Sequence, residues 1–242
     1  MLFPIFSVIA SVLVIASFVV PLFSTGMMDR MAESEGQHDP LTYIVLFAFY
    51  FCSYFVIVFF NTALTACAMK VVEGDVPKVS YGLSVAMKRA PQIAAWALLS
   101  AVIGLLLNII ENTSKKLGKF ITAVIGTGWT ILTFFVVPVL CVEGVGPFAA
   151  VKKSFETLQK TWGEGVVGNF SISTIAFLVT LPIYILLIVA GIMSNNGYVL
   201  LACVLLCIAV AIITAIASSA AEGVFKALLY NYATGRSLPE DI

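Results

Sequence analysis

Six long apolar runs without any Asp, Glu, Lys or Arg constrain this chain more than any other feature. They cover residues 2–23, 41–69, 91–110, 120–142, 165–193 and 198–221. A helix needs roughly 20 apolar residues to cross the hydrocarbon core of a bilayer. The runs are continuous, whereas the strands of a membrane β-barrel alternate apolar and polar residues. With 61% hydrophobic and 11% charged residues, we predict one all-α transmembrane domain over residues 1–242, a bundle of six spans.

The charges outside these runs predict the orientation of the chain. Six spans place both termini on the same side, and that side carries most of the 13 Lys and Arg residues. Loops rich in Lys and Arg stay in the cytoplasm, so we expect both termini there. The formal net charge is zero, which gives no basic surface for nucleic acid. We therefore expect membrane lipids, and no nucleic acid, as partners.

An internal repeat divides the chain into units. The motif E-G-x-x-P occurs at residues 73–77 after the second run and at residues 143–147 after the fourth, about 70 residues later. A fainter echo at residues 235–239 follows the sixth run. We therefore predict three repeated units, each of two spans.

Each full motif is followed by a segment with helical periodicity. In residues 147–162 one face carries Phe148, Val151, Phe155, Leu158 and Trp162, and charged residues lie opposite. Residues 78–90 have a similar pattern. We predict two cytoplasmic amphipathic helices, which either lie in the membrane interface or form the floor of the bundle.

Asn61 and Asn169 are polar residues within the apolar runs. Polar groups inside a membrane are costly, so they suggest function by default. They could line a path for a solute or ion. Alternatively each makes a hydrogen bond between helices, and we favour this structural interpretation.

Glu73 and Glu143 occupy equivalent positions in the repeat. Each lies at the end of a predicted span, where the helix dipole disfavours a negative charge. An unfavourable residue placed twice indicates a specific partner. We favour a structural latch, held by a loop N–H group or a basic residue, over a substrate or proton site.

Small residues recur every four positions in the sixth run, at Ala211, Ala215, Ser219 and Gly223. Such a seam lets another helix approach closely. The partner is either another helix of the bundle, which we favour, or a second subunit in a homo-oligomer.

Residues for enzyme chemistry are scarce. The one histidine, His38, lies beside Asp39 in a loop without metal-ligand spacing around it. The chain has no G-x-S-x-G motif and no P-loop. We therefore predict no catalytic residues, no metal site and no cofactor.

The segment from Val137 to Pro147, VPVLCVEGVGP, with Lys152-Lys153-Ser154 and Trp162 after it, resembles an uncharacterised prokaryotic family of six-span membrane proteins. Phe60-Asn61-Thr62-Ala63-Leu64 and Ala227-Leu228-Leu229-Tyr230 fit the same pattern. The family is more distantly similar to the membrane domain of bacterial glycerophosphodiester phosphodiesterases. The resemblance implies the fold and a prokaryotic cytoplasmic membrane, but no activity. Members usually begin with a basic amphipathic segment that is missing before Met1, so we expect a truncated or misassigned start.

Two functions remain open from the sequence. The first, which we favour, is a non-enzymatic scaffold or assembly component that organises lipids or partner proteins. It is suggested by the sparse polar residues within the spans, the small-residue seam and the amphipathic helices. The second is a transporter or channel for a lipid or small solute, suggested by the repeat, by Asn61 and by Pro138 and Pro182 within the spans.

Overall fold

The computed structural model describes residues 2–24, 40–113, 117–194 and 196–235, and the elements of these residues are all helices. The long ones are α1 (Phe3–Ser24), α3 (Pro40–Val72), α5 (Ala90–Thr113), α6 (Leu117–Leu132), α9 (Trp162–Met193) and α10 (Gly197–Ala233). Three shorter helices are α4 (Val79–Lys88), α7 (Val136–Glu143) and α8 (Pro147–Lys160). The predicted all-α class is confirmed.

Six helical stretches are long and apolar enough to cross a membrane. They are Phe3–Ser24, Pro40–Val72, Ala90–Glu111, Gly118–Glu143, Thr174–Met193 and Gly197–Ala233. They coincide with the six apolar runs of the sequence and suggest a multi-pass membrane protein. In hydrocarbon, a helix satisfies the backbone N–H and C=O groups within its own segment, which explains why apolar runs of this length adopt it.

The fourth stretch is interrupted. Helix α6 ends at Leu132 and α7 begins at Val136. Pro138 has no N–H group to donate, and its ring crowds the carbonyl four residues earlier, at Phe134. The break also leaves the N–H of Phe135 outside both helices, and this N–H donates to Ser154 Oγ at 2.9 Å. Pro182, the second proline within the apolar runs, does not interrupt its helix, since α9 continues through it.

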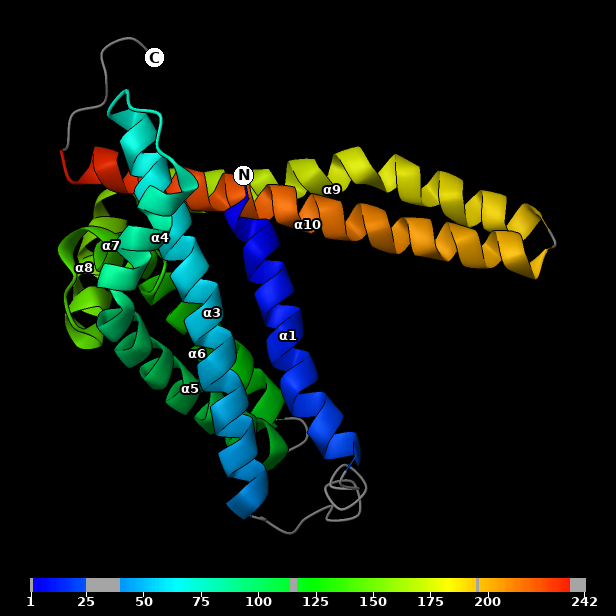
Figure 1. Cartoon of the computed structure of the whole chain (residues 1–242), viewed down its shortest axis with the longest axis horizontal. Coiled ribbons are helices and arrows are strands. Elements are labelled where there is room, and N and C mark those ends of the chain that lie inside the picture. The colour runs from blue at the N-terminus through cyan, green and yellow to red at the C-terminus, as the bar shows by residue number, and fades with distance from the viewer. Residues whose placement is uncertain (1, 25–39, 114–116, 195, 236–242) are drawn as a thin grey trace.

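The best-packed core lies at one end of the molecule, where α4, α7, α8 and the last turns of α10 meet α3, α5 and α6 (Figure 1). Phe135, Leu140 and Tyr230 are fully buried there, and Trp96 stacks on Trp129 with 5.6 Å between ring centroids. Phe3, at the start of α1, packs at the same end of the molecule.

The hairpin of α9 and α10 does not close a compact six-helix bundle. Most of α9 and the N-terminal part of α10 extend sideways from the body as an arm (Figure 1). The two helices of the arm pack on each other, and α9 otherwise contacts chiefly α8. Many large apolar side chains of the arm are exposed, among them Phe177, Leu186, Ile192 and Ile213. Such a surface is stable in contact with lipid rather than with water.

Helix α8 buries a face that only partly coincides with the predicted apolar stripe. Leu158 of the stripe is buried together with Ala150, Ser154 and Thr157, whereas Phe148 is 77% exposed. Phe155 and Trp162 are exposed as well. Ser154 faces inward, within hydrogen-bond distance of the α6–α7 break. The aromatic residues of the predicted stripe therefore lie on an outer surface.

Gly82 brings α4 against α3. A Cβ atom at this position would lie 2.6 Å from the carbonyl oxygen of Ala63 and 2.8 Å from Cys67 Sγ. The backbone oxygen cannot rotate away as a side chain could. Only glycine therefore permits the observed approach of the two helices.

We predict that Gly82→Ala lowers the melting temperature of the protein in detergent. Alanine adds up to about 1 kcal/mol of helix propensity, but overpacking of this contact costs about 1–3 kcal/mol. The matched control is Gly128→Ala in α6, where a Cβ meets no atom within 4 Å. The control should leave the melting temperature unchanged or raise it. An equal effect of both substitutions would show that Gly82 is not required for packing.

Candidate functional site

A polar cavity lies where α3, the α6–α7 break and α10 meet. Its volume is about 230 Å³. The residues that line it are Asn61, Thr65, Thr130, Thr133, Phe134, Val137, Pro138, Ser219, Glu222, Gly223 and Lys226. Most of these side chains carry a polar or charged group, although every contributing helix belongs to an apolar stretch long enough to span a membrane.

Two threonine hydroxyl groups that line the cavity near the end of α6 can accept hydrogen bonds. Thr130 Oγ1 donates its hydrogen to the Gly126 carbonyl at 2.9 Å, and Thr133 Oγ1 donates to the Trp129 carbonyl at 2.8 Å. A threonine hydroxyl has one hydrogen and two lone pairs. Once the hydrogen is used within the helix, the oxygen retains capacity to accept a hydrogen bond from a bound group.

Helix α10 supplies the charges. Lys226 Nζ lies 3.9 Å from Glu222 Oε2, and their side chains are 29% and 27% exposed. The same Nζ lies 5.0 Å from the centroid of the Phe134 ring, where the face of the ring attracts a cation. A charged pair at this position within a long apolar helix is expensive, which marks it as a candidate functional feature.

The structure brings three of the sequence-predicted residues to this cavity. Asn61 comes from α3, and Ser219 and Gly223 come from α10. Glu222 and Lys226 were not recognised as site residues, because an i, i+4 pair where a helix leaves the membrane resembles an ordinary surface contact. The sequence did contain a pattern that could have identified them, because residues 219, 222, 223 and 226 lie on one face of a helix.

Glu143 lies outside the cavity, in a network of its own. Its carboxylate forms an ion pair with Lys153 of α8 and accepts a hydrogen bond from the Tyr230 hydroxyl of α10 at 2.8 Å. Glu143 thus connects the end of α7 to the next helix, α8, and to α10, whose Tyr230 is 87 residues away in the sequence. These partners suit the predicted latch, and its contribution to stability stays a prediction.

Arg89 offsets the negative end of α7 beside Glu143. Its Nε donates to the Cys141 carbonyl at 3.2 Å, and its second terminal nitrogen donates to the Val142 carbonyl at 3.1 Å. A cation at the last carbonyl groups of a helix is favourable. Gly144 ends the helix with φ of 60°, and a Cβ there would collide with the guanidinium group.

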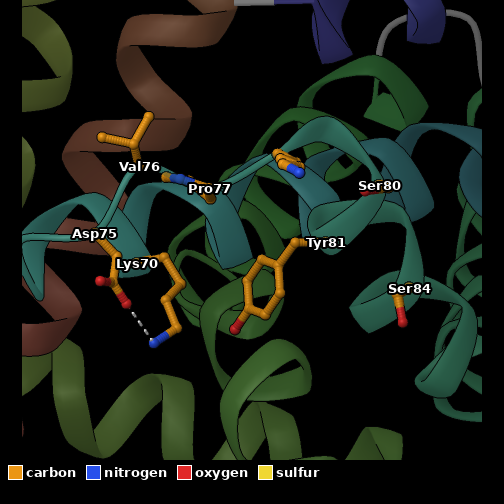
Figure 2. A pocket seen from close by; sticks show the side chains of 8 residues that line it. Lys70, Asp75, Val76, Pro77, Ser80, Tyr81 and Ser84 are labelled. Carbon is orange, nitrogen blue, oxygen red and sulfur yellow. Dashed lines mark hydrogen bonds and ion pairs between the residues drawn. The ribbon is translucent and has the colours of Figure 1, made fainter.

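Glu73, the repeat equivalent of Glu143, has a different environment. It is 57% exposed, and it pairs with Lys70 on its own helix at 2.8 Å. Lys70 also holds Asp75 at 3.0 Å, at the edge of an open hollow of about 490 Å³ between α3 and α4 (Figure 2). Exposed pairs of this kind contribute little to stability. We therefore place the candidate site at the cavity and not at this hollow.

The remaining predicted residues do not join a site in the described part of the chain. Ala211 and Ala215 are exposed, so only the Gly223 end of the predicted seam meets another helix, at Leu64 of α3. Asn169 belongs to α9, but its side chain lies outside what the structure describes. Within the described residues, no group of three or more His, Cys, Asp or Glu side chains could hold a metal ion.

Comparison with known proteins gives one result. Residues 41–238 match the model of a family of unknown function, DUF6159. The chain belongs to this family. The matched region contains every residue that lines the cavity and the whole Glu143 network. No curated protein and no solved structure is significantly similar to the chain.

We predict that Glu143→Gln lowers the melting temperature in detergent. The substitution removes the charge that pairs with Lys153 while Tyr230 keeps an acceptor, and a hydrogen bond to a charged group contributes about 1.5–3 kcal/mol. The matched control is Glu73→Gln, whose exposed pair is worth about 0–1 kcal/mol. If both variants melted at the wild-type temperature, Glu143 would not be a latch.

Proposed function

We propose that this protein binds a small polar solute, or the polar headgroup of a lipid, in the cavity between α3, α6–α7 and α10, and moves it within or across the membrane. The observation that carries the proposal is the convergence of Asn61, Glu222 and Lys226 on one cavity between long apolar helices. The function is non-enzymatic, with no cofactor or metal.

The cost of the charges supports a ligand-binding role. Replacement of a buried ion pair by apolar residues is often neutral or stabilising, so a structural role alone is a weak reason for such a pair. A helix seam needs only small residues, as at Gly223. Glu222 and Lys226 are better accounted for by a group that they bind.

The depth of the cavity supports access for a lipid headgroup. Asn61 is 21 residues beyond Pro40, about 32 Å along α3. The hydrocarbon core is about 30 Å thick. Measured along α3, the cavity lies about one core thickness from the start of the helix, near a membrane boundary.

The scaffold function is a second candidate, and a specific observation favours it. The arm, the outer face of α8 with Phe148 and Phe155, and Trp162 at the start of α9 expose far more apolar surface than one cavity requires. These surfaces suit membrane lipids, a second copy of the chain or another membrane protein. In this function the cavity would be an accessory feature of the assembly.

The proposed arrangement is three repeated two-span units with α4 and α8 on the cytoplasmic side of a prokaryotic membrane, where both termini also lie. The geometry of the repeat supports it. Gly74, Gly144 and Gly235 follow α3, α7 and α10, and they are the glycines with positive φ among the described residues. The distant similarity to the membrane domain of glycerophosphodiester phosphodiesterases stays a prediction.

We predict that Asn61→Leu abolishes ligand movement and leaves folding intact. Leucine has the same number and branching of side-chain heavy atoms as asparagine but removes the amide that the cavity offers to a polar group. The measurement is translocation of tail-labelled fluorescent phospholipids in proteoliposomes, together with uptake of a panel of small polar solutes. The matched control is Asn108→Leu in α5, which changes the same groups outside the cavity.

The control should transport like the wild type. Equal transport by the two variants, with both correctly folded, would contradict the proposed function and leave the scaffold. Absence of any wild-type flux, together with a stable oligomer in gentle detergent, would also favour the scaffold.

A further inference from the structure

We propose that the ligand of the cavity is a zwitterion, a small group with one ammonium and one acidic function. Examples of the class are the headgroup of a phospholipid with an amino alcohol and a free amino acid. This inference rests on the proposed function, because it names the chemistry of the group that the cavity binds. It follows from the charge, spacing and size of the site.

The charges of the lining residues balance. Among the residues that the structure describes, Glu222 and Lys226 are the charged side chains that line the cavity, and their formal charges cancel. A ligand with a single charge would pair with one of them and repel the other. In a medium of low dielectric constant this repulsion is strong. A zwitterion pairs with both and leaves the site neutral.

Lys226 has a second favourable contact besides Glu222. The N–O distance between the two charged groups is 3.9 Å, longer than the usual 2.7–2.9 Å of a hydrogen-bonded ion pair. Lys226 Nζ also lies 5.0 Å from the centroid of the Phe134 ring, so the ammonium keeps this contact when a ligand binds beside Glu222. The acidic function of the ligand would then take Lys226.

The neutral groups match the two halves of a zwitterion. The oxygens of Thr130 and Thr133 can accept hydrogen bonds from an ammonium group that Glu222 attracts. The side-chain amide of Asn61 can donate to the acidic half. The site therefore offers acceptors and donors in addition to one charge of each sign.

The size of the cavity limits the ligand to a small group. Its volume of about 230 Å³ lies below the range of about 300–1,000 Å³ that is usual for drug-sized ligands. A whole phospholipid cannot enter. A headgroup whose acyl chains remain in the bilayer fits this limit, and so does a free small zwitterion.

The experiment is a competition read by native mass spectrometry of the whole protein in gentle detergent. The probes are phosphatidylethanolamine as the zwitterion, phosphatidylglycerol as the anion and a trimethylammonium lipid as the cation. Glycerophosphoethanolamine, which has the same headgroup without acyl chains, distinguishes a soluble ligand from a lipid. Wild-type protein should retain one zwitterionic molecule, at least about tenfold in preference to either charged lipid.

Variants of the pair should change the preference in opposite directions. Glu222→Gln leaves a positive cavity and should favour phosphatidylglycerol, whereas Lys226→Gln should favour the cationic lipid. Exchange of the two residues, Glu222→Lys with Lys226→Glu, restores neutrality and should restore retention of the zwitterion. The control is Lys152→Gln, which breaks an i, i+4 pair of the same 3.9 Å spacing on the exposed face of α8 and should change nothing.

The outcomes separate the two proposals. If the wild type retains a singly charged probe and Asn61→Leu abolishes this retention, the zwitterion inference is wrong and the proposed function stands. If no probe is retained in a manner that depends on Asn61, both are wrong. Should a pair variant fail to fold, the wild-type preference among the three lipids still decides.

Discussion

The hydrogen bond from the Phe135 N–H to Ser154 Oγ supports the interruption on which the rest of the structure depends. Backbone groups within an apolar layer must find partners, and a helix normally supplies them. Between α6 and α7 the helix is interrupted ahead of Pro138. The side chain of Ser154, 19 residues further along the chain, supplies the acceptor for the Phe135 N–H. Without that bond, the break would cost the desolvation of a buried N–H group, about 1–3 kcal/mol.

Residues on the two sides of the α6–α7 break contribute to two different sites, the polar cavity and the Glu143 network. Thr133 and Phe134 turn toward the cavity, whereas Phe135 is buried beside Tyr230 with 6.1 Å between ring centroids. Tyr230 in turn donates to Glu143. Glu222, Lys226 and Tyr230 are each four residues apart on α10, so one face of this helix touches both the cavity and the latch network.

Local patterns in the sequence predicted the parts of the fold that depend on local physics. Hydrophobic length predicted the six long helices, and the repeat motif contains Gly74 and Gly144, the glycines with positive φ that follow α3 and α7. Asn61 was identified as unusual because a polar residue within an apolar run is visible without a structure. The break ahead of Pro138 also has a local origin, because proline has no N–H group to donate.

The remainder depends on contacts between distant segments, which no local pattern encodes. Ser154 of α8 faces inward, where it accepts a hydrogen bond from the Phe135 N–H. The apolar stripe that includes Phe155 therefore did not predict which face of α8 is buried. Glu143 and Glu73 share a motif but not an environment, because only Glu143 lies within reach of Tyr230. The importance of Glu222 became evident only when α3 and the α6–α7 break were placed beside α10.

The sideways arm and the cavity have a common cause, which is the crossing of α10 over α3. At the crossing, Gly223 lets α10 approach Leu64, since a Cβ would lie 2.6 Å from its Cδ2. Helices that cross diverge on both sides of their contact. Toward the N-terminus of α10 the divergence carries Ala215 and Ala211 away from α3 and into the arm, where α10 packs on α9. Next to the contact it leaves the space that Ser219, Glu222 and Lys226 line. A parallel arrangement would have closed the small-residue seam along its length, and the same residues would then have had no cavity to face.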